Sequence, residues 1–246
     1  MIALLRAELR KLFTTRWFLV TVATTAVLGP ISAASNALTP KVSAAELGTP
    51  SSIHHILSVA ALTSMAMMAA GIAAMAGEFR HNTSITTFLI TPRRSAVVIA
   101  KLITLSVVGA VVGAIAFGLS VAAAIPALSS KGVHHLAGDT AQMWIGCAFV
   151  SALFAALGVA VGALTRSTVA AIVSSIVWAM FVEVAILDTH WPKLGRWLPL
   201  GANLAVTRTA GHLGRLLAPG AAALVLVAWI VVICLLALTS SIRRDV

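Results

Sequence analysis

The sequence has 246 residues, of which 60% are hydrophobic and 10% are charged. A soluble domain usually carries about 25% charged residues, so this composition excludes a soluble protein and indicates a membrane protein. The formal net charge of +10 comes from 17 Lys and Arg against 7 Asp and Glu, which the positive-inside rule explains without nucleic acid as a partner. The apolar runs are continuous, whereas a membrane β-barrel needs alternating segments of about ten residues. The fold class is therefore all-α.

The first sixteen residues predict an amphipathic helix at the membrane interface. Its apolar side carries five residues at helical spacing: Ile2, Leu5, Leu9, Leu12 and Phe13. Three basic residues lie opposite: Arg6, Arg10 and Lys11. Glu8 and Lys11 are three residues apart and can pair on the flank of the helix. Leu4 is the one residue that breaks the pattern.

Six apolar stretches reach the length of about 20 residues that a membrane span needs. They are residues 17–34, 53–76, 97–125, 143–164, 168–187 and 218–239. The third span, with 29 residues, is longer than a membrane requires, so we expect its Lys101 end to protrude or snorkel on the cytoplasmic side. Pro126 is expected to close this span. Residues 165–167 alone separate the fourth and fifth spans, which predicts a tight antiparallel hairpin. The chain is expected to be one polytopic domain, 1–246, with six transmembrane helices and an N-terminal interfacial elbow helix, 1–16.

The distribution of basic residues predicts that both termini are cytoplasmic. With the N terminus inside, eleven of the 17 Lys and Arg lie on the cytoplasmic side and six outside, as the positive-inside rule requires. Four of those six lie in the outer segment 188–217. The Trp and Leu residues of that segment predict that it dips into the interface. The expected location is the bacterial inner membrane.

The loop 77–94 between the second and third spans is the most informative segment. Thr83 or Ser84 can cap a short helix that ends before Pro92. One face of this helix carries three apolar residues: Ile85, Phe88 and Leu89. Nothing in the loop covers that face, and basic residues flank it. The pattern fits a helix that docks into a groove of a soluble partner and fits a helix lying on anionic lipid equally well.

The same loop carries a family resemblance. The residues concerned are, in order, Glu78, Phe79, Arg80, Thr83, Thr91, Pro92, Arg94 and Lys101. This order resembles the inner-loop signature of ABC transporter permeases of the type-2 export family. The opening AELRKLFTTR before Trp17 is similar to the elbow helix of that family, and the stretch around Arg166 to its turn between spans four and five. The chain departs from the pattern at His81 and Asn82, where a Gly often precedes the Thr.

This resemblance implies a permease subunit that pairs with a second, usually identical, permease copy and with two ABC ATP-binding subunits. In such proteins the inner loop inserts into a cleft of the ATPase, and the elbow helix lies beside it. Carried over residue by residue, the coupling positions are Glu78, Phe79, Arg80, Thr83 and Pro92. The apolar face of Ile85, Phe88 and Leu89 is added on physical grounds. ATP and Mg²⁺ are expected in the partner ATPase.

The sequence offers no catalytic motif of its own. It contains no Gly-Lys-Ser/Thr sequence that could cradle phosphates, and no His-Glu-x-x-His metalloprotease motif. We therefore expect no enzymatic activity, no cofactor and no metal in this chain. His54 with His55 and His134 with His135 form two doublets, but adjacent residues on a helix point about 100° apart and cannot chelate as a pair. We expect these histidines to be hydrated at the interface.

Glu183 is the only acidic residue inside a predicted span. An ionisable residue in hydrocarbon is a functional hypothesis by default. Here it makes Glu183 a candidate for the substrate cavity, as a polar contact in the exit cavity of the dimer. Its position four residues before the end of the span, about 6 Å, favours the alternative that its side chain reaches outer-leaflet water. Arg208, His212 and Arg215 form a stripe at helical spacing that is expected to face lipid phosphates. Glycine pairs four residues apart are expected to be packing surfaces within the subunit: Gly109 with Gly113, and Gly158 with Gly162.

The function expected from these features is export of an amphipathic or hydrophobic compound, such as a drug or an antimicrobial peptide. ATP hydrolysis in the separate partner subunits would supply the energy. The alternative is a secondary transporter or channel, which needs intramembrane charges for its coupling ions. A membrane-embedded sensor or scaffold without transport is a third class.

Overall fold

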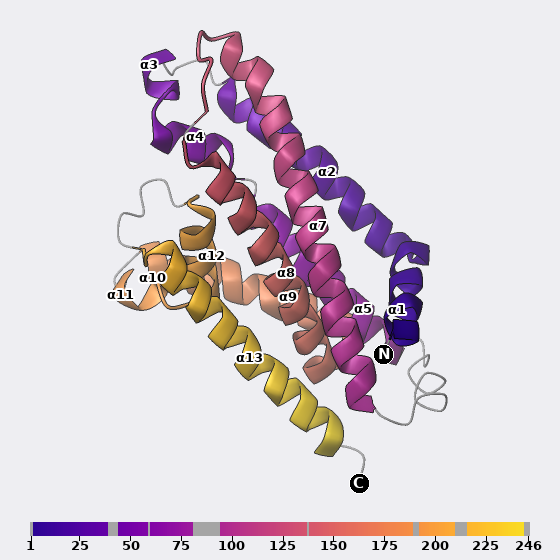
Figure 1. The fold of residues 1–246 in the computed structure, drawn as a ribbon. Helices are drawn as coiled ribbons and strands as arrows, with labels where there is room; N and C mark the ends of the chain where they lie inside the picture. Colours follow the sequence, from indigo (N-terminus) through magenta and orange to yellow (C-terminus); the bar gives the residue numbers. More distant parts are fainter. Residues whose placement is uncertain are drawn as a thin grey trace.

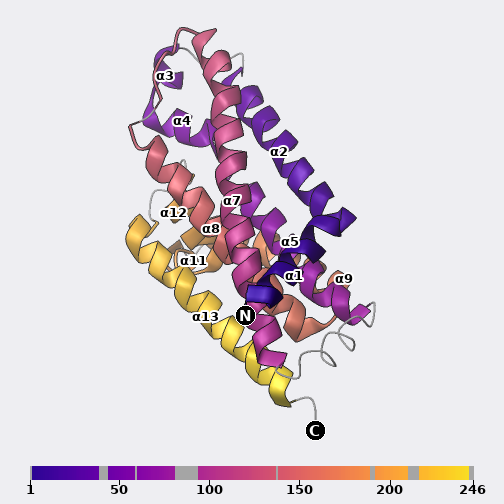
Figure 2. The same ribbon diagram turned by 45° about the vertical axis from the view of Figure 1, so that its right-hand side comes forward.

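The computed structural model describes residues 2–38, 44–58, 60–80, 94–136, 138–188, 192–209 and 216–243. All regular secondary structure in these residues is helical, and six helices are long and apolar enough to cross a membrane. The protein is thus an all-α polytopic membrane protein, as predicted. The N-terminal helix, the start of α7 and the end of α13 lie at one end of the bundle (Figures 1 and 2). α3 and α4 lie at the opposite end.

The helices follow the predicted spans in number, with bounds that differ at several ends. In the first half they are α1 (Ile2–Thr14), α2 (Arg16–Ala37), α3 (Ala44–Leu47), α4 (Pro50–Ile56), α5 (Ala60–Arg80) and α7 (Arg94–Ser129). In the second half they are α8 (Thr140–Thr165), α9 (Thr168–Val177), the π-helical segment η1 (Trp178–Glu183), α10 (Val184–Asp188), α11 (Pro192–Gly195), α12 (Pro199–Thr207) and α13 (Pro219–Arg243). α9, η1 and α10 together form the fifth span.

The predicted second span, 53–76, is wrong at its start. Residues 53–56 belong to the separate helix α4, which begins with Pro50 after the N-cap Thr49. The Thr49 hydroxyl accepts a hydrogen bond from the Ser52 amide at 3.4 Å. Thr49 and Pro50 are helix-start signals, and the transmembrane helix α5 begins only at Ala60.

The third span extends beyond its predicted end. Pro126 lies inside α7, which continues to Ser129. The carbonyl of Pro126 still accepts the Ser130 amide at 3.1 Å, so the last turn is held although a proline lacks its own N–H. At 1.5 Å per residue, the 36 residues of α7 span about 54 Å, more than the hydrocarbon core of about 30 Å. α7 therefore projects beyond the membrane core.

The central helix is α8, which packs most extensively against α5 and α7. The glycines of the predicted pairs make these contacts close. A Cβ on Gly158 would lie 2.0 Å from the Met68 carbonyl oxygen of α5, and one on Gly113 would lie 2.5 Å from the Ser151 hydroxyl of α8. The prediction that these pairs are packing surfaces within the chain is confirmed.

The hairpin predicted between the fourth and fifth spans is also confirmed. Arg166 ends α8 in the left-handed region, with φ of 53°. Ser167 then caps α9 by accepting the Ala170 amide. The connection between α8 and α9 is therefore as short as predicted.

The described part of the segment 188–217, which was expected to dip into the outer interface, enters the bundle more deeply than predicted. Helix α12 packs against α8, α13 and α5, and most of its residues are buried. Its small residues, among them Gly201 and Ala202, permit this close approach. Helix α12 is therefore a packed part of the helical bundle.

Candidate functional site

Four charged residues join α1 to the helices on either side of the loop 81–93, and we call them the charge cluster: Glu8, Lys11, Glu78 and Lys101. Lys101 Nζ donates to Glu8 Oε2 at 2.5 Å and to Glu78 Oε1 at 3.1 Å. Lys11 Nζ donates to the same two carboxylates, at 3.0 Å to Glu8 and 3.1 Å to Glu78. Each ammonium group bridges both acids, so the cluster is a closed network.

The burial of the charge cluster is uneven. The side chains of Glu8 and Lys101 are 1% and 3% exposed, whereas that of Lys11 is 45% exposed. Burial raises the pKa of Glu8, but the Lys101 charge and the hydrogen bonds from both lysines outweigh it, and the pKa lies below its usual value. Burial lowers the pKa of Lys11, but Glu8 and Glu78 outweigh it and raise the pKa. Both ions are therefore favoured in the folded state.

Of the two expectations for this end of the third span, that it protrudes or that Lys101 snorkels, the position of Lys101 contradicts the second. Its ammonium group is buried against two carboxylates because α1 folds back onto the start of α7. Glu8 was expected to pair with Lys11, and does, but its burial was missed. The signal lies in Leu4, the exception to the amphipathic pattern: Leu4, Glu8 and Leu12 share the face of α1 that packs on the bundle, while Ile2 and Phe13 stay exposed.

The predicted coupling positions fall partly within the described residues. Glu78 belongs to the charge cluster, and the ring of Phe79 lies 5.2 Å from the Arg166 guanidinium carbon, in cation–π contact. Arg80 is the last residue of α5. The other predicted coupling residues lie outside the described residues: Thr83, Ile85, Phe88, Leu89 and Pro92.

Glu183 does not reach outer-leaflet water, so that expectation is wrong. The residue is 2% exposed. Its Oε1 accepts the Trp178 indole N–H at 2.7 Å, and its Oε2 accepts the Leu200 amide at 2.6 Å. Leu200 lies in the first turn of α12, where free amides and the helix dipole favour a negative charge. Glu183 therefore caps α12 from another helix, a contact that no local sequence pattern signals.

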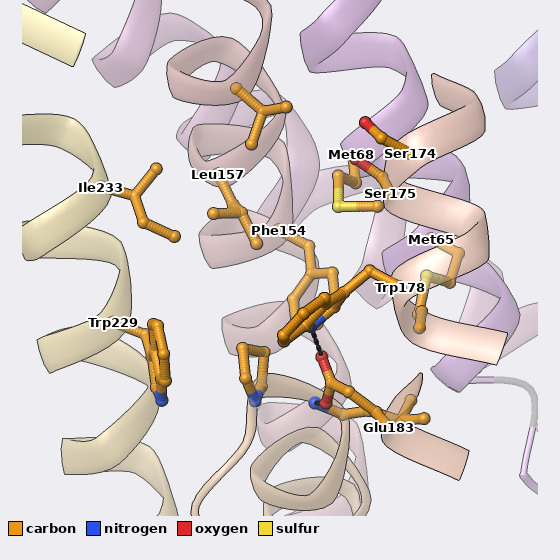
Figure 3. Close-up of a pocket in the computed structure, with 14 residues that line it drawn as sticks. Met65, Met68, Phe154, Leu157, Ser174, Ser175, Trp178, Glu183, Trp229 and Ile233 are labelled. Carbon is orange, nitrogen blue, oxygen red and sulfur yellow. Dashed lines mark hydrogen bonds between the residues drawn. The ribbon is translucent and has the colours of Figure 1, made fainter. Parts of the chain in front are cut away.

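An apolar cavity of about 330 Å³ adjoins Glu183. Figure 3 shows it between α13, with Trp229 and Ile233, and the α9–η1 segment, with Ser174 and Trp178, while Phe154 and Leu157 of α8 lie behind. Met65 and Met68 of α5 close a further side. Among its lining residues Glu183 is the one that carries an ionisable group. The expected cavity lies between two copies of the chain, whereas this one is formed by residues of a single chain.

A second ionic group lies at the opposite end of the bundle from α1. Asp139, which precedes α8, accepts from His54 Nε2 at 3.0 Å and from Arg208 Nη1 at 2.7 Å. His54 is thus hydrogen-bonded to a carboxylate and not simply hydrated. Within the described parts of the chain, no group of three His, Cys, Asp or Glu side chains could hold a metal. The contact instead joins α4, α8 and α12.

The predicted stripe of Arg208, His212 and Arg215 does not continue α12. The helix ends at Thr207, and Arg208 adopts the left-handed conformation with φ of 56°. Its guanidinium group contacts Asp139, and His212 and Arg215 lie outside the described residues. Arg208 therefore binds a protein carboxylate, where we expected lipid phosphate.

Replacing Asp139 by Asn should cost about 1 kcal/mol of stability at pH 7, because two charge-assisted contacts weaken. Burial raises the pKa of Asp139, but His54 and Arg208 hold it below its usual value. A lowered folded-state pKa gives stability that is present above the unfolded value of about 3.9 and is lost as the pH falls through the folded value. The difference in thermal midpoint between wild type and Asp139→Asn should therefore shrink from pH 7 to pH 3. An equal difference in thermal midpoint at both pH values would contradict this account. The control is Glu46→Gln, which replaces an exposed acidic residue.

No protein-family model matches the chain, and no curated protein is significantly similar to it in sequence.

Proposed function

We propose that the protein is the transmembrane permease subunit of an ABC exporter for amphipathic or hydrophobic compounds. The observation that carries the proposal is the charge cluster, which fastens α1 to the ends of the loop whose sequence resembles the family signature. An elbow helix beside the inner loop is what the resemblance implies. Glu78, a matched coupling position, is itself a member of the cluster. This agreement between a motif and a contact between residues 93 positions apart favours a permease over other membrane bundles.

The charge cluster also suggests how force would pass from the ATPase to the membrane helices. A partner that moves the loop 81–93 pulls on the last turn of α5 and the first turns of α7. Glu78 and Lys101 lie in those turns and are joined through Glu8 to α1. Because separating the partners of a buried ion pair leaves an uncompensated charge at a cost of several kcal/mol, the three helix ends should move as one unit. Two permease copies and two ATP-binding subunits with ATP and Mg²⁺ would complete the exporter.

Photo-crosslinking tests the proposed docking directly. A photoreactive phenylalanine analogue at position 88 should crosslink to a soluble chain that carries a Gly-Lys-Ser/Thr phosphate-binding sequence. The matched control is the same analogue at Phe181, which is 71% exposed within the fifth span and should crosslink to lipid or to membrane chains. If position 88 crosslinks only to lipid, the loop is a membrane-surface helix and the proposal is wrong.

We also propose that the bundle end carrying α1 faces the cytoplasm, in the bacterial inner membrane. Single cysteines at Ser84 and Ser130, with Cys147 and Cys234 replaced by Ala, report the orientation. An impermeant thiol reagent added to intact cells should label the Ser130→Cys protein, because the turn after α7 lies at the other end from α1. The Ser84→Cys protein should be labelled only after lysis. Labelling of both from outside would contradict the six-span topology.

A secondary transporter is the second candidate, and one observation favours it: a carboxylate buried inside the fifth span. A coupling residue must release its contacts when it binds an ion. Both oxygens of Glu183 are instead held by N–H donors, one of them in the first turn of α12. The geometry therefore favours a carboxylate that keeps its hydrogen bonds over one that releases them to bind and release a coupling ion.

A further inference from the structure

The cavity beside Glu183 combines three features that together specify a ligand. Its volume of about 330 Å³ falls at the lower end of the range of small-molecule sites, about 300–1,000 Å³. Its walls are mostly aliphatic, thioether and aromatic side chains from α5, α8, η1, α12 and α13. Two of the aromatic side chains are indoles, those of Trp178 and Trp229, whose faces attract cations.

The carboxylate supplies the third feature. Among the described residues, Glu183 accepts two hydrogen bonds, from the Trp178 indole and from the Leu200 amide. Each carboxylate oxygen can accept a further contact. Among the described residues, no Lys, Arg or His forms an ion pair with Glu183. A negative charge in apolar surroundings, without a cationic partner from the described part of the protein, is best compensated by a cationic ligand.

The two indoles are held in place by their own hydrogen bonds. Trp178 Nε1 donates to Glu183, and Trp229 Nε1 donates to the Trp197 carbonyl oxygen at 2.8 Å. With the N–H edges occupied in this way, the rings contribute their bodies and faces to the cavity. Figure 3 shows the two rings on different sides of the cavity, with the Glu183 carboxylate below Trp178.

We propose that this cavity is a binding site for a lipophilic monocation, with the charge held by Glu183 and the apolar groups by the Trp, Met and Leu side chains. An anion of the same shape would meet the carboxylate at short range and be repelled. The site as such needs no ATPase, but its use as the substrate site of an exporter rests on the proposed function. The spans that flank it, α9–α10 and α13, are mostly exposed, so a ligand dissolved in lipid can approach from the membrane.

The first test uses the wild-type protein and a pair of ions of equal shape and opposite charge. Binding of tetraphenylphosphonium and of tetraphenylborate to the purified protein is measured by equilibrium dialysis, with empty micelles as the blank. We expect the cation to bind at least about tenfold more tightly than the anion, because a single buried charge contact is worth that factor or more. Equal binding, or tighter binding of the anion, overturns the proposal without any mutation.

Two variants locate the site. Glu183→Gln keeps an oxygen for the cap of α12 and removes the charge, so it should weaken binding of the cation about tenfold and leave that of the anion unchanged or stronger. Ser175→Phe, at a half-buried lining residue, should block binding of the cation by filling the cavity while leaving Glu183 in place. Glu46→Gln, which removes an exposed acid elsewhere, should bind the cation like wild type.

The outcomes separate this proposal from the proposed function. If Ser175→Phe, folded by its thermal midpoint, binds the cation like wild type, the cavity is not the site and the inference is overturned. Retained selectivity for the cation in a folded Glu183→Gln protein overturns it as well. Selective binding lost in both variants supports the site even if no ATPase associates with the chain. The absence of an associated ATPase would refute the exporter, and the binding site would still be supported.

Discussion

Replacing Lys101 by Met is expected to lower the free energy of unfolding by about 3–5 kcal/mol, the usual cost of removing one partner from a buried ion pair. The side chain of Lys101 is 3% exposed and contacts Glu8 and Glu78. Without it, the buried carboxylate of Glu8 retains only Lys11, which solvent screens. Chemical denaturation in mixed micelles measures the loss.

A matched control lies in the same cluster. Lys11→Met removes an ammonium group that contacts the same two acids but is 45% exposed, so it should cost no more than about 1 kcal/mol. Adding Glu8→Gln to Lys101→Met should recover part of the stability, because the uncompensated charge is removed with its partner. Two results would show that the cluster is not the anchor of α1. One is a Lys101→Met protein as stable as wild type, and the other is a larger loss of stability from Lys11→Met than from Lys101→Met.

Replacing Gly158 by Ala is expected to destabilise the contact between α5 and α8 by about 1–3 kcal/mol or more, the range for overpacking. A Cβ at this position would lie 2.0 Å from the Met68 carbonyl oxygen and 3.0 Å from the Ile72 amide nitrogen. Both atoms belong to the backbone of α5, which cannot turn aside as a side chain could. The two helices must therefore separate at the most extensive contact in the bundle.

The control for this substitution is Gly77→Ala in α5. Beyond the backbone of its own helix, no atom of the described residues lies within 4 Å of a Cβ at Gly77, and alanine favours helix over glycine by up to about 1 kcal/mol. The thermal midpoint of Gly77→Ala should equal or exceed that of wild type, while that of Gly158→Ala should fall. A Gly158→Ala protein with an unchanged midpoint would mean that α5 and α8 do not pack as described.

The sequence predicted the spans well because each is a long apolar run, a property of neighbouring residues. It also predicted the hairpin at Arg166, which follows from the short connection between two spans. The glycine contacts of α8 follow from the small side chains at those positions. The errors at Ile53 and Pro126 are errors of boundary. At Ile53, the cap Thr49 and Pro50 start a separate short helix before the span, and at Pro126 the helix continues because the following turn keeps its hydrogen bonds.

The buried charges could not be predicted in the same way. Lys101 and Glu8 lie 93 positions apart, and counting residues from the end of a span suggests that Lys101 snorkels when nothing indicates that α1 covers it. Glu183 was misplaced for the same reason: its partner Leu200 comes from an outer segment that was expected at the interface. Both errors come from tertiary contacts that bring a partner to a charge, which a single segment does not encode.

The most direct measurement of the central claim is ATP hydrolysis by whatever complex purifies through a tag on this chain. We expect an ATP-binding chain to copurify with this protein and to hydrolyse ATP. Phe88→Ala should lose that chain, since truncating such an anchor costs about 2 kcal/mol, or about 30-fold in affinity. The variant should still insert and keep the thermal midpoint of wild type. If the wild-type chain instead purifies without an ATPase and moves a lipophilic compound on an ion gradient alone, the exporter assignment is contradicted.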